Sequence, residues 1–183
     1  MTIKKIMNSR KLWLTMIVVL LGSLTASAHD FEVGGIYYNI TSSSDLTVAV
    51  TYNNSNSDEY SGAVAIPSTV TYNSNTYSVR SIENYAFQNC NSLTSITIPA
   101  GVMSIGDHTL SGCSSLTSIT LSEGMTSIGY YAFSGCSSLT SITIPEGMIS
   151  IGYGAFAGCS SLTSITLPYS LTSIRNEAFL SCI

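Results

Sequence analysis

Residues 137–145 read SSLTSITIP, and this short stretch decides the fold because it recurs. Close copies stand at 91–99, 114–122 and 160–168. Each copy begins 23 residues after the one before it, without insertion or deletion. A fixed period between about 20 and 50 residues is the sequence signature of a solenoid. The sequence therefore predicts a stack of similar units rather than a globular domain with a single centre.

Each unit contains two hydrophobic spacings. From Ile128 to Cys136 the apolar residues lie three or four apart, which is typical of a short helical turn with one buried face. From Ile142 to Ile144 the step is two, which predicts a strand with Thr143 on its opposite face. We expect each unit to form a strand and a short helical segment. The strands of successive units then make a parallel sheet on one side of the coil.

The apolar positions stay in register over residues 82–183, which we divide into four full units and a truncated fifth. One column holds isoleucine, another holds phenylalanine or leucine, and a third holds cysteine: Ile82, Ile105, Ile128, Ile151 and Ile174; Phe87, Leu110, Phe133, Phe156 and Phe179; Cys90, Cys113, Cys136, Cys159 and Cys182. One unit alone buries too little apolar surface to offset the ~1–2 kcal/mol of backbone entropy lost per ordered residue. The units must therefore stack to fold.

Residues 29–81 fall outside the period and predict a β-rich N-terminal cap. The segments 36–40 and 46–52 alternate with period two and predict a hairpin, and 69–72 with 76–79 predict a second one. The segment 63–67 resembles the end of a repeat and is a candidate first rung. A solenoid needs its first apolar face covered, which favours a cap. A separate small β domain is the alternative, but the join to the first unit leaves no room for a linker.

Residues 1–28 predict a secretory signal peptide. A basic start is followed by an apolar run at 12–21 and by Ala-Ser-Ala at 26–28, so cleavage is expected after Ala28. The alternative is an uncleaved membrane anchor, but the apolar run is shorter than the ~20 residues that a spanning helix needs. We expect a secreted or cell-surface protein that meets a membrane only through secretion or surface attachment.

The charge of the remaining chain excludes two classes of partner. From His29 onward, only Arg80 and Arg175 stand against ten carboxylates, which gives a formal net charge of −8 and leaves no lysine. Nucleic acids and anionic membrane surfaces are bound through clustered lysine and arginine. No nucleic-acid partner is therefore expected.

The cysteines and histidines offer no metal, cofactor or catalytic site. An odd number of cysteines leaves at least one unpaired, and their 23-residue period favours a row of small buried side chains, with disulfides between rungs as the alternative. There is no Cys-x-x-Cys pair for zinc. Asp107 and His108 are the one approach to a general-base pair, but their position varies between units, which favours a solvated loop. We predict no cofactor and no enzyme activity.

The repeat Ala-Phe-x-x-Cys-x-Ser-Leu-Thr-Ser-Ile-Thr-Ile-Pro closely resembles the BspA-type leucine-rich repeat family. The start at 30–38 is also similar to secreted members from gut and oral Bacteroidetes. The resemblance implies a right-handed leucine-rich-repeat solenoid of α/β character and a surface adhesion role, often toward host matrix proteins. It implies no catalytic residues. The second unit departs from the pattern, with Ser122 in place of proline and Thr109-Leu110 in place of Ala-Phe.

Two sets of side chains are candidates for contact with a protein or glycan partner. The first is the outward strand face, and the second is a position that varies between units: Thr97, Thr120, Thr143 and Thr166; Tyr85, Tyr130, Tyr131 and Tyr153. The threonines are identical in every rung and carry little information. Tyrosine supplies contact area at a low cost in conformational entropy, so the tyrosines are the better candidates.

Two functions remain open from the sequence. We prefer a secreted or cell-surface interaction module that adheres to a host or matrix protein or glycan. The alternative is a structural spacer, the N-terminal fragment of a longer surface protein. The chain stops at Ile183, before the strand of the fifth unit, so we expect an exposed apolar rung there. Truncation of the reading frame is favoured over association through that rung.

Overall fold

A computed structural model describes residues 29–53 and 59–182. The expected signal peptide over 1–28 and most of the polar loop near residue 55 lie outside these residues. The described part of the chain consists of strands and turns and contains no helix. It accordingly holds no helix that is long and apolar enough to cross a membrane.

The cap segment contains the two predicted hairpins and one further antiparallel pair at its start. Its strands are β1 (Phe31–Val33), β2 (Ile36–Ser42), β3 (Thr47–Thr51), β5 (Thr69–Tyr72) and β6 (Asn75–Ile82). Strand β2 pairs antiparallel with β1 and with β3, and β5 pairs antiparallel with β6. The β5–β6 turn places Asn73 and Ser74 at φ 47° and 64°, the left-handed conformation that tight hairpin turns require. Both predicted hairpins are confirmed.

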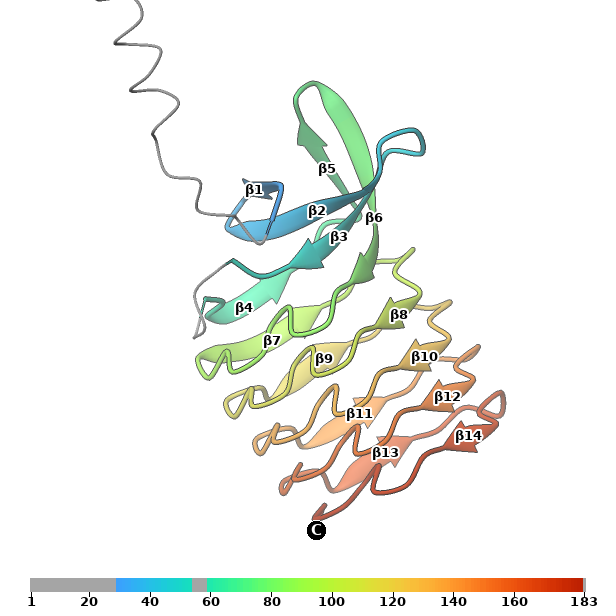
Figure 1. The fold of residues 1–183 in the computed structure, drawn as a ribbon. Helices are drawn as coiled ribbons and strands as arrows, with labels where there is room; N and C mark the ends of the chain where they lie inside the picture. The colour runs from blue at the N-terminus through green and yellow to red at the C-terminus, as the bar shows by residue number, and fades with distance from the viewer. Residues whose placement is uncertain (1–28, 54–58, 183) are drawn as a thin grey trace, which may run out of the picture.

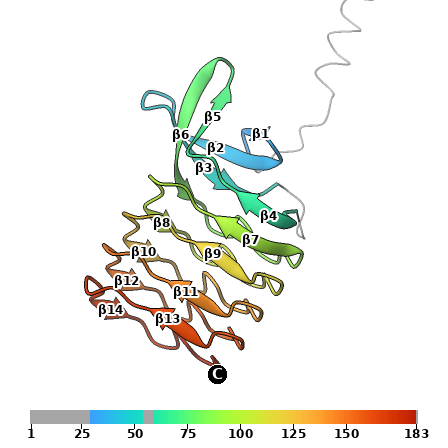
Figure 2. The same ribbon diagram turned by 180° about the vertical axis from the view of Figure 1, so that it is seen from behind.

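The repeat array carries two parallel ladders, which Figures 1 and 2 show from opposite sides. The first ladder consists of two paired groups in line with each other: β4 (Gly62–Ala65), β7 (Leu93–Thr97) and β9 (Ser118–Thr120), then β11 (Ser141–Thr143) and β13 (Ser164–Thr166). The second continues from β6 through β8 (Ser104–Ile105), β10 (Ser127–Ile128), β12 (Ser150–Ile151) and β14 (Ser173–Ile174). The pairings among β7 to β14, and that of β6 with β8, join positions 23 residues apart, as in Ser127 with Ser104 and Ile142 with Ile165. Strand β4 departs from this spacing, because it pairs Ala63 with Ser95. The predicted parallel strands are present, and the second ladder was not anticipated.

The expected helical segment is a run of turns, so the α/β character is not confirmed. Alternate backbone N–H groups leave their own rung and bond to the next one. The N–H of Phe87 donates to the Thr109 carbonyl at 2.8 Å, and the N–H of Leu110 donates to the Ala132 carbonyl at 2.7 Å. Each unit also holds residues with positive φ in this segment, such as Tyr131 at 53°. A left-handed residue interrupts a right-handed helix, and the freed peptide groups face the neighbouring rung instead.

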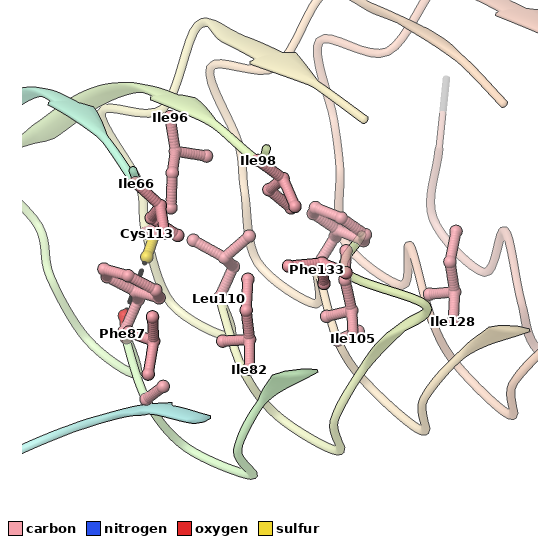
Figure 3. Packing of buried hydrophobic residues seen from close by; sticks show 14 of the residues in the cluster. Ile66, Ile82, Phe87, Ile96, Ile98, Ile105, Leu110, Cys113, Ile128 and Phe133 are labelled. Atoms are coloured by element: carbon pink, nitrogen blue, oxygen red, sulfur yellow. Dashed lines mark hydrogen bonds between the residues drawn. The ribbon is translucent and has the colours of Figure 1, made fainter. Parts of the chain in front are cut away.

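One continuous hydrophobic cluster runs through the coil. Ile82, Ile105 and Ile128 repeat along it in Figure 3 and are each at most 3% exposed. The rings of Phe133 and Phe156 stack with centroids 5.0 Å apart and planes 1° apart. In the fifth unit the isoleucine position changes environment: Ile174 is 46% exposed, whereas Ile151 is fully buried.

The cysteines form the buried row that the sequence favoured, without disulfides. Four are buried and Cys182 is half-buried, and none of the five forms a disulfide. Each of the last four donates its thiol proton to a backbone carbonyl of the preceding rung, as Cys113 does to Phe87 O at 3.0 Å (Figure 3). Burial raises the pKa of the Cys159 thiol to about 12. These thiols therefore act as small apolar groups that also satisfy a carbonyl.

The cap and the array share a core. Strand β4 pairs in parallel with β7, with Ala65 opposite Thr97, in the place of a rung strand. The ring of Tyr60, in the cap, lies 4.5 Å from that of Phe87 in the first unit. These contacts favour a cap over an independent β domain, because a separate domain would leave its own core isolated from the first rung.

Candidate functional site

Four aromatic side chains form a continuous row across successive rungs. We call Tyr85, His108, Tyr131 and Tyr153 the aromatic row. The centroids of Tyr85 and His108 are 5.3 Å apart with planes at 13°, and those of His108 and Tyr131 are 5.1 Å apart with planes at 22°. Tyr131 meets Tyr153 edge-on at 5.3 Å and 72°. Stacked and edge-to-face pairs are the favoured arrangements of aromatic rings.

The backbone of the turns sets the spacing of this row. Tyr85, His108 and Tyr131 each stand three residues after a strand of the second ladder, and each has φ between 53° and 64°. Their N–H groups donate to the carbonyls of Asp107, Tyr130 and Tyr153 in the next rung at 2.8–3.0 Å. The same conformation at the same position holds the rings in line. The ring spacing therefore follows the distance between rungs.

The row changes position at its last member. Gly154 occupies the slot that Tyr131 fills one rung earlier, and a Cβ atom at Gly154 would lie 2.5 Å from Cε1 of Tyr131. The ring of Tyr131 therefore covers Gly154, and Tyr153 completes the row from the neighbouring position. The interaction of the Tyr153 hydroxyl with Glu177, followed by burial and by the neighbouring Tyr131, raises the pKa of this phenol.

The rings of the aromatic row and its neighbour Tyr130 differ in how far they are exposed to solvent. Tyr85 is 45% exposed and Tyr130, which neighbours the row, is 51% exposed. His108, Tyr131 and Tyr153 are half-buried. An exposed aromatic surface on a rigid support can contact a partner without a large loss of side-chain entropy.

A pocket of about 360 Å³ lies beside the end of the row. It is lined by Tyr130, Tyr153, Arg175 and Asn176. It combines two phenol rings, a guanidinium group and a carboxamide, and it lies in the rungs where the row ends.

The threonine candidates lie on a different ladder from the row. Thr97, Thr120, Thr143 and Thr166 are all exposed, on β7, β9, β11 and β13. The row is carried instead by the turns that follow the second ladder. The structure thus groups the tyrosine candidates with one another and leaves the threonines as a separate flat face.

Asp107 and His108 do not form an acid–base pair. The Oδ1 atom of Asp107 accepts a hydrogen bond from the Tyr130 N–H at 2.7 Å, and the His108 ring is stacked between two tyrosines. In the described part of the chain, no group of three histidine, cysteine, aspartate or glutamate side chains is placed to hold a metal ion.

Sequence reasoning missed three members of this site: His108 as part of the row, and Arg175 and Asn176 in the pocket. The register contained the signal for His108, because it stands 23 residues from both Tyr85 and Tyr131. No such signal marks Arg175, because the same position in the preceding units holds glutamate or glycine.

Comparison with known proteins places this architecture. Residues 68–183 match the BspA type leucine rich repeat region in six copies, so the matched repeats begin inside the segment expected as a cap. A solved leucine rich repeat protein of T. pallidum is 29% identical with a TM-score of 0.71, over 83% of this chain and 67% of its own. No curated protein matches the chain.

Two further solved structures are similar over less of their own length. A leucine-rich repeat protein from Bacteroides ovatus is 35% identical, with a TM-score of 0.66, over 84% of this chain and 45% of its own. A leucine rich cell surface protein from Faecalibacterium prausnitzii is 29% identical, with a TM-score of 0.59, over 82% of this chain and 45% of its own. From the family match over most of its length, this chain belongs to the BspA-type leucine-rich repeat family.

Proposed function

We propose that this protein is a secreted or cell-surface interaction module that adheres to a host or matrix protein or glycan through its repeat surface. The observation that carries the proposal is the aromatic row, which crosses four rungs. Tyr85 within the row and Tyr130 beside it are exposed. Tyrosine is enriched at the energetic centres of protein interfaces. A rigid row of such rings offers an extended contact surface.

Two other observations support this assignment. The similar protein from F. prausnitzii is described as a cell surface protein. The N-terminal segment of this chain carries the sequence pattern of a signal peptide. Both are consistent with a protein that works outside the cytoplasm.

The aromatic row is a better candidate surface than the threonine face. The threonines repeat without change on every rung, so any register along that face is equivalent to the next. The row varies from rung to rung: tyrosine, histidine, tyrosine, and then a shift to the adjacent position at Tyr153. A surface that differs along its length can select one partner in one position.

The test is binding of the chain from His29 to Ile183, which contains the whole described core, to immobilised matrix proteins and mucin. We expect saturable binding that the double variant Tyr85→Ser/Tyr130→Ser weakens at least tenfold, because each removes an exposed ring. The matched control is Tyr169→Ser, which removes a fully exposed tyrosine outside the row. Equal loss in the control, or no binding to any ligand of the panel, would contradict the proposal.

The alternative function is that of a structural spacer within a longer surface protein. It is favoured by the length of the relatives, since the chain spans 45% of two of them. It is also favoured by the exposed isoleucine of the fifth unit. A spacer would show no saturable binding, and appending further 23-residue units would raise its thermal stability by covering Ile174.

A further inference from the structure

In one column of the array, a side-chain oxygen of one rung accepts a hydrogen bond from the backbone N–H of the next rung, and this pattern ends at the pocket. The column consists of Asn84, Asp107, Tyr130, Tyr153 and Asn176, which stand one rung apart. The Oδ1 atom of Asn84 accepts from the N–H of Asp107 at 2.7 Å. The Oδ1 atom of Asp107 then accepts from the N–H of Tyr130, also at 2.7 Å. In both cases a side-chain oxygen satisfies the backbone N–H of the following rung.

This pattern of hydrogen bonds ends at Tyr130, because its phenol side chain does not accept a hydrogen bond from the backbone N–H of Tyr153. No described residue accepts a hydrogen bond from the N–H of Tyr153 or of Asn176. Tyr153 and Asn176 both line the 360 Å³ pocket. The pocket thus lies at the position that corresponds to the carboxamide oxygen of Asn84 and the carboxylate oxygen of Asp107 in the earlier rungs.

The positive charge of Arg175 also favours a carboxylate in this pocket. Arg175 is the one residue among the lysines and arginines of the chain that lies within 82–183, and it lines the pocket. Among the described carboxylates, none forms an ion pair with Arg175. Glu177 interacts instead with the Tyr153 hydroxyl. An unpaired guanidinium beside free N–H donors favours a carboxylate, which can accept from several donors at once.

We propose that this pocket binds the carboxylate of an acidic sugar. One carboxylate oxygen accepts a hydrogen bond from the N–H of Tyr153, as Asp107 Oδ1 does from the N–H of Tyr130 one rung earlier. The other accepts from Arg175. The exposed ring of Tyr130 packs against the carbon face of the sugar, and Asn176 bonds its hydroxyls.

A sugar fits this site better than an acidic peptide. The lining has two phenol rings, a guanidinium and a carboxamide, and no aliphatic side chain that would receive a neighbouring peptide side chain. The pocket volume is within the range of small-molecule sites. The formal charge of −8 from His29 onward disfavours polyanions, so a sugar with one carboxylate is preferred to a heavily sulfated chain. This inference rests on the proposed function and names the ligand class of that surface.

The experiment uses the full chain, expressed with its own leader and purified, and ligand-observed NMR titrations with 3′-sialyllactose and with methyl glucuronide. We expect both to bind, and lactose and methyl glucoside, which lack the carboxylate, to bind at least tenfold more weakly. Arg175→Gln should weaken binding at least tenfold by removing the charge. Tyr130→Asn should abolish it, because the new carboxamide caps the Tyr153 N–H as Asn84 caps Asp107. Tyr130→Phe retains the ring and should bind as the parent does.

Several results would overturn the inference. They are equal binding of lactose and sialyllactose, no binding of either acid, or tighter binding of an acetylated glutamate peptide, which would reassign the pocket to protein ligands. An unchanged melting temperature in Arg175→Gln and Tyr130→Asn ensures that lost binding is local. The outcomes for the two proposals remain distinct. If Tyr85→Ser weakens adhesion to the panel while Arg175→Gln does not, the adhesion function stands and the sugar site fails.

Discussion

At the scale of single residues, the array depends on glycines that let neighbouring rungs approach. A Cβ atom built on Gly129 would lie 2.6 Å from both the carbonyl carbon and the oxygen of Gly106. Gly152 has the same relation to Gly129, with its nearest contact at 2.5 Å. These contacts are with backbone atoms, which cannot rotate away as a side chain can. Glycine is needed here for space rather than for an unusual backbone angle.

We therefore expect Gly129→Ala to destabilise the protein by about 1–3 kcal/mol, the usual cost of overpacking. Thermal unfolding followed by circular dichroism measures the effect. The matched control is Glu123→Ala, at an exposed position, which should change stability by less than about 0.5 kcal/mol. If Gly129→Ala melts at the parent temperature, the rungs are further apart than the structure has them.

The thiols provide a second residue-scale prediction. Burial raises the pKa of the Cys136 and Cys159 thiols well above neutrality, so they remain protonated and shielded. At pH 8 in the folded protein we expect iodoacetamide to modify Cys182, which is half-buried, long before Cys136. Mass spectrometry of the digested protein locates the label. All five cysteines should react in guanidinium chloride, and rapid labelling of Cys136 in the folded state would contradict the buried row.

At the scale of elements, the turn segment is held by a stack of phenylalanine rings. Phe156 stacks on Phe133 at 5.0 Å and on Phe179 at 5.4 Å, with planes 1° and 4° apart. Phe156 is fully buried, whereas Phe179, in the fifth unit, is half-buried. Phenylalanine thus occupies the same position of the turn segment in an interior rung and in the last rung.

The two positions should respond differently to truncation. Phe156→Ala should cost about 3–5 kcal/mol, because it removes a buried ring and leaves a cavity between two others. Phe179→Ala should cost clearly less, because part of its ring already contacts water. Denaturant unfolding of both variants supplies the comparison. Equal losses would show that the fifth rung is as well packed as the interior ones.

At the scale of the whole molecule, the cap and the array should unfold together. They share the ladder from β3 through β6 to β8 and one hydrophobic cluster from Phe31 to Ala178. Contacts that cross the boundary, such as Tyr60 on Phe87, couple the two parts. Repeat arrays propagate stability through such nearest-neighbour interfaces.

We expect a single urea transition for the chain, with the same midpoint by far-ultraviolet circular dichroism and by tyrosine fluorescence. Substitution of Tyr60 by alanine, in the cap, should lower that midpoint for both signals. Two separated transitions, or a Tyr60→Ala effect seen by one signal alone, would mean that the cap is an independent domain.

The 23-residue period determined most of the fold before any coordinates. It identified the columns of Ile, Phe and Cys and the parallel strands. The register of these features is local information, because each unit repeats the same order of residues. The family resemblance followed from the same pattern and is confirmed by the family match over residues 68–183.

Only the tertiary structure decided how the turn segment is built and where its side chains meet. The apolar spacing from Ile128 to Cys136 suits a helix, yet left-handed residues and hydrogen bonds to the next rung produce turns, since stacked units offer partners that an isolated unit lacks. The row through His108 and the pocket at Arg175 arise between rungs. Apart from the adjacent Arg175 and Asn176, their members lie about one repeat or more apart in sequence. Their contact therefore depends on the stacking distance, which the order of residues alone does not specify.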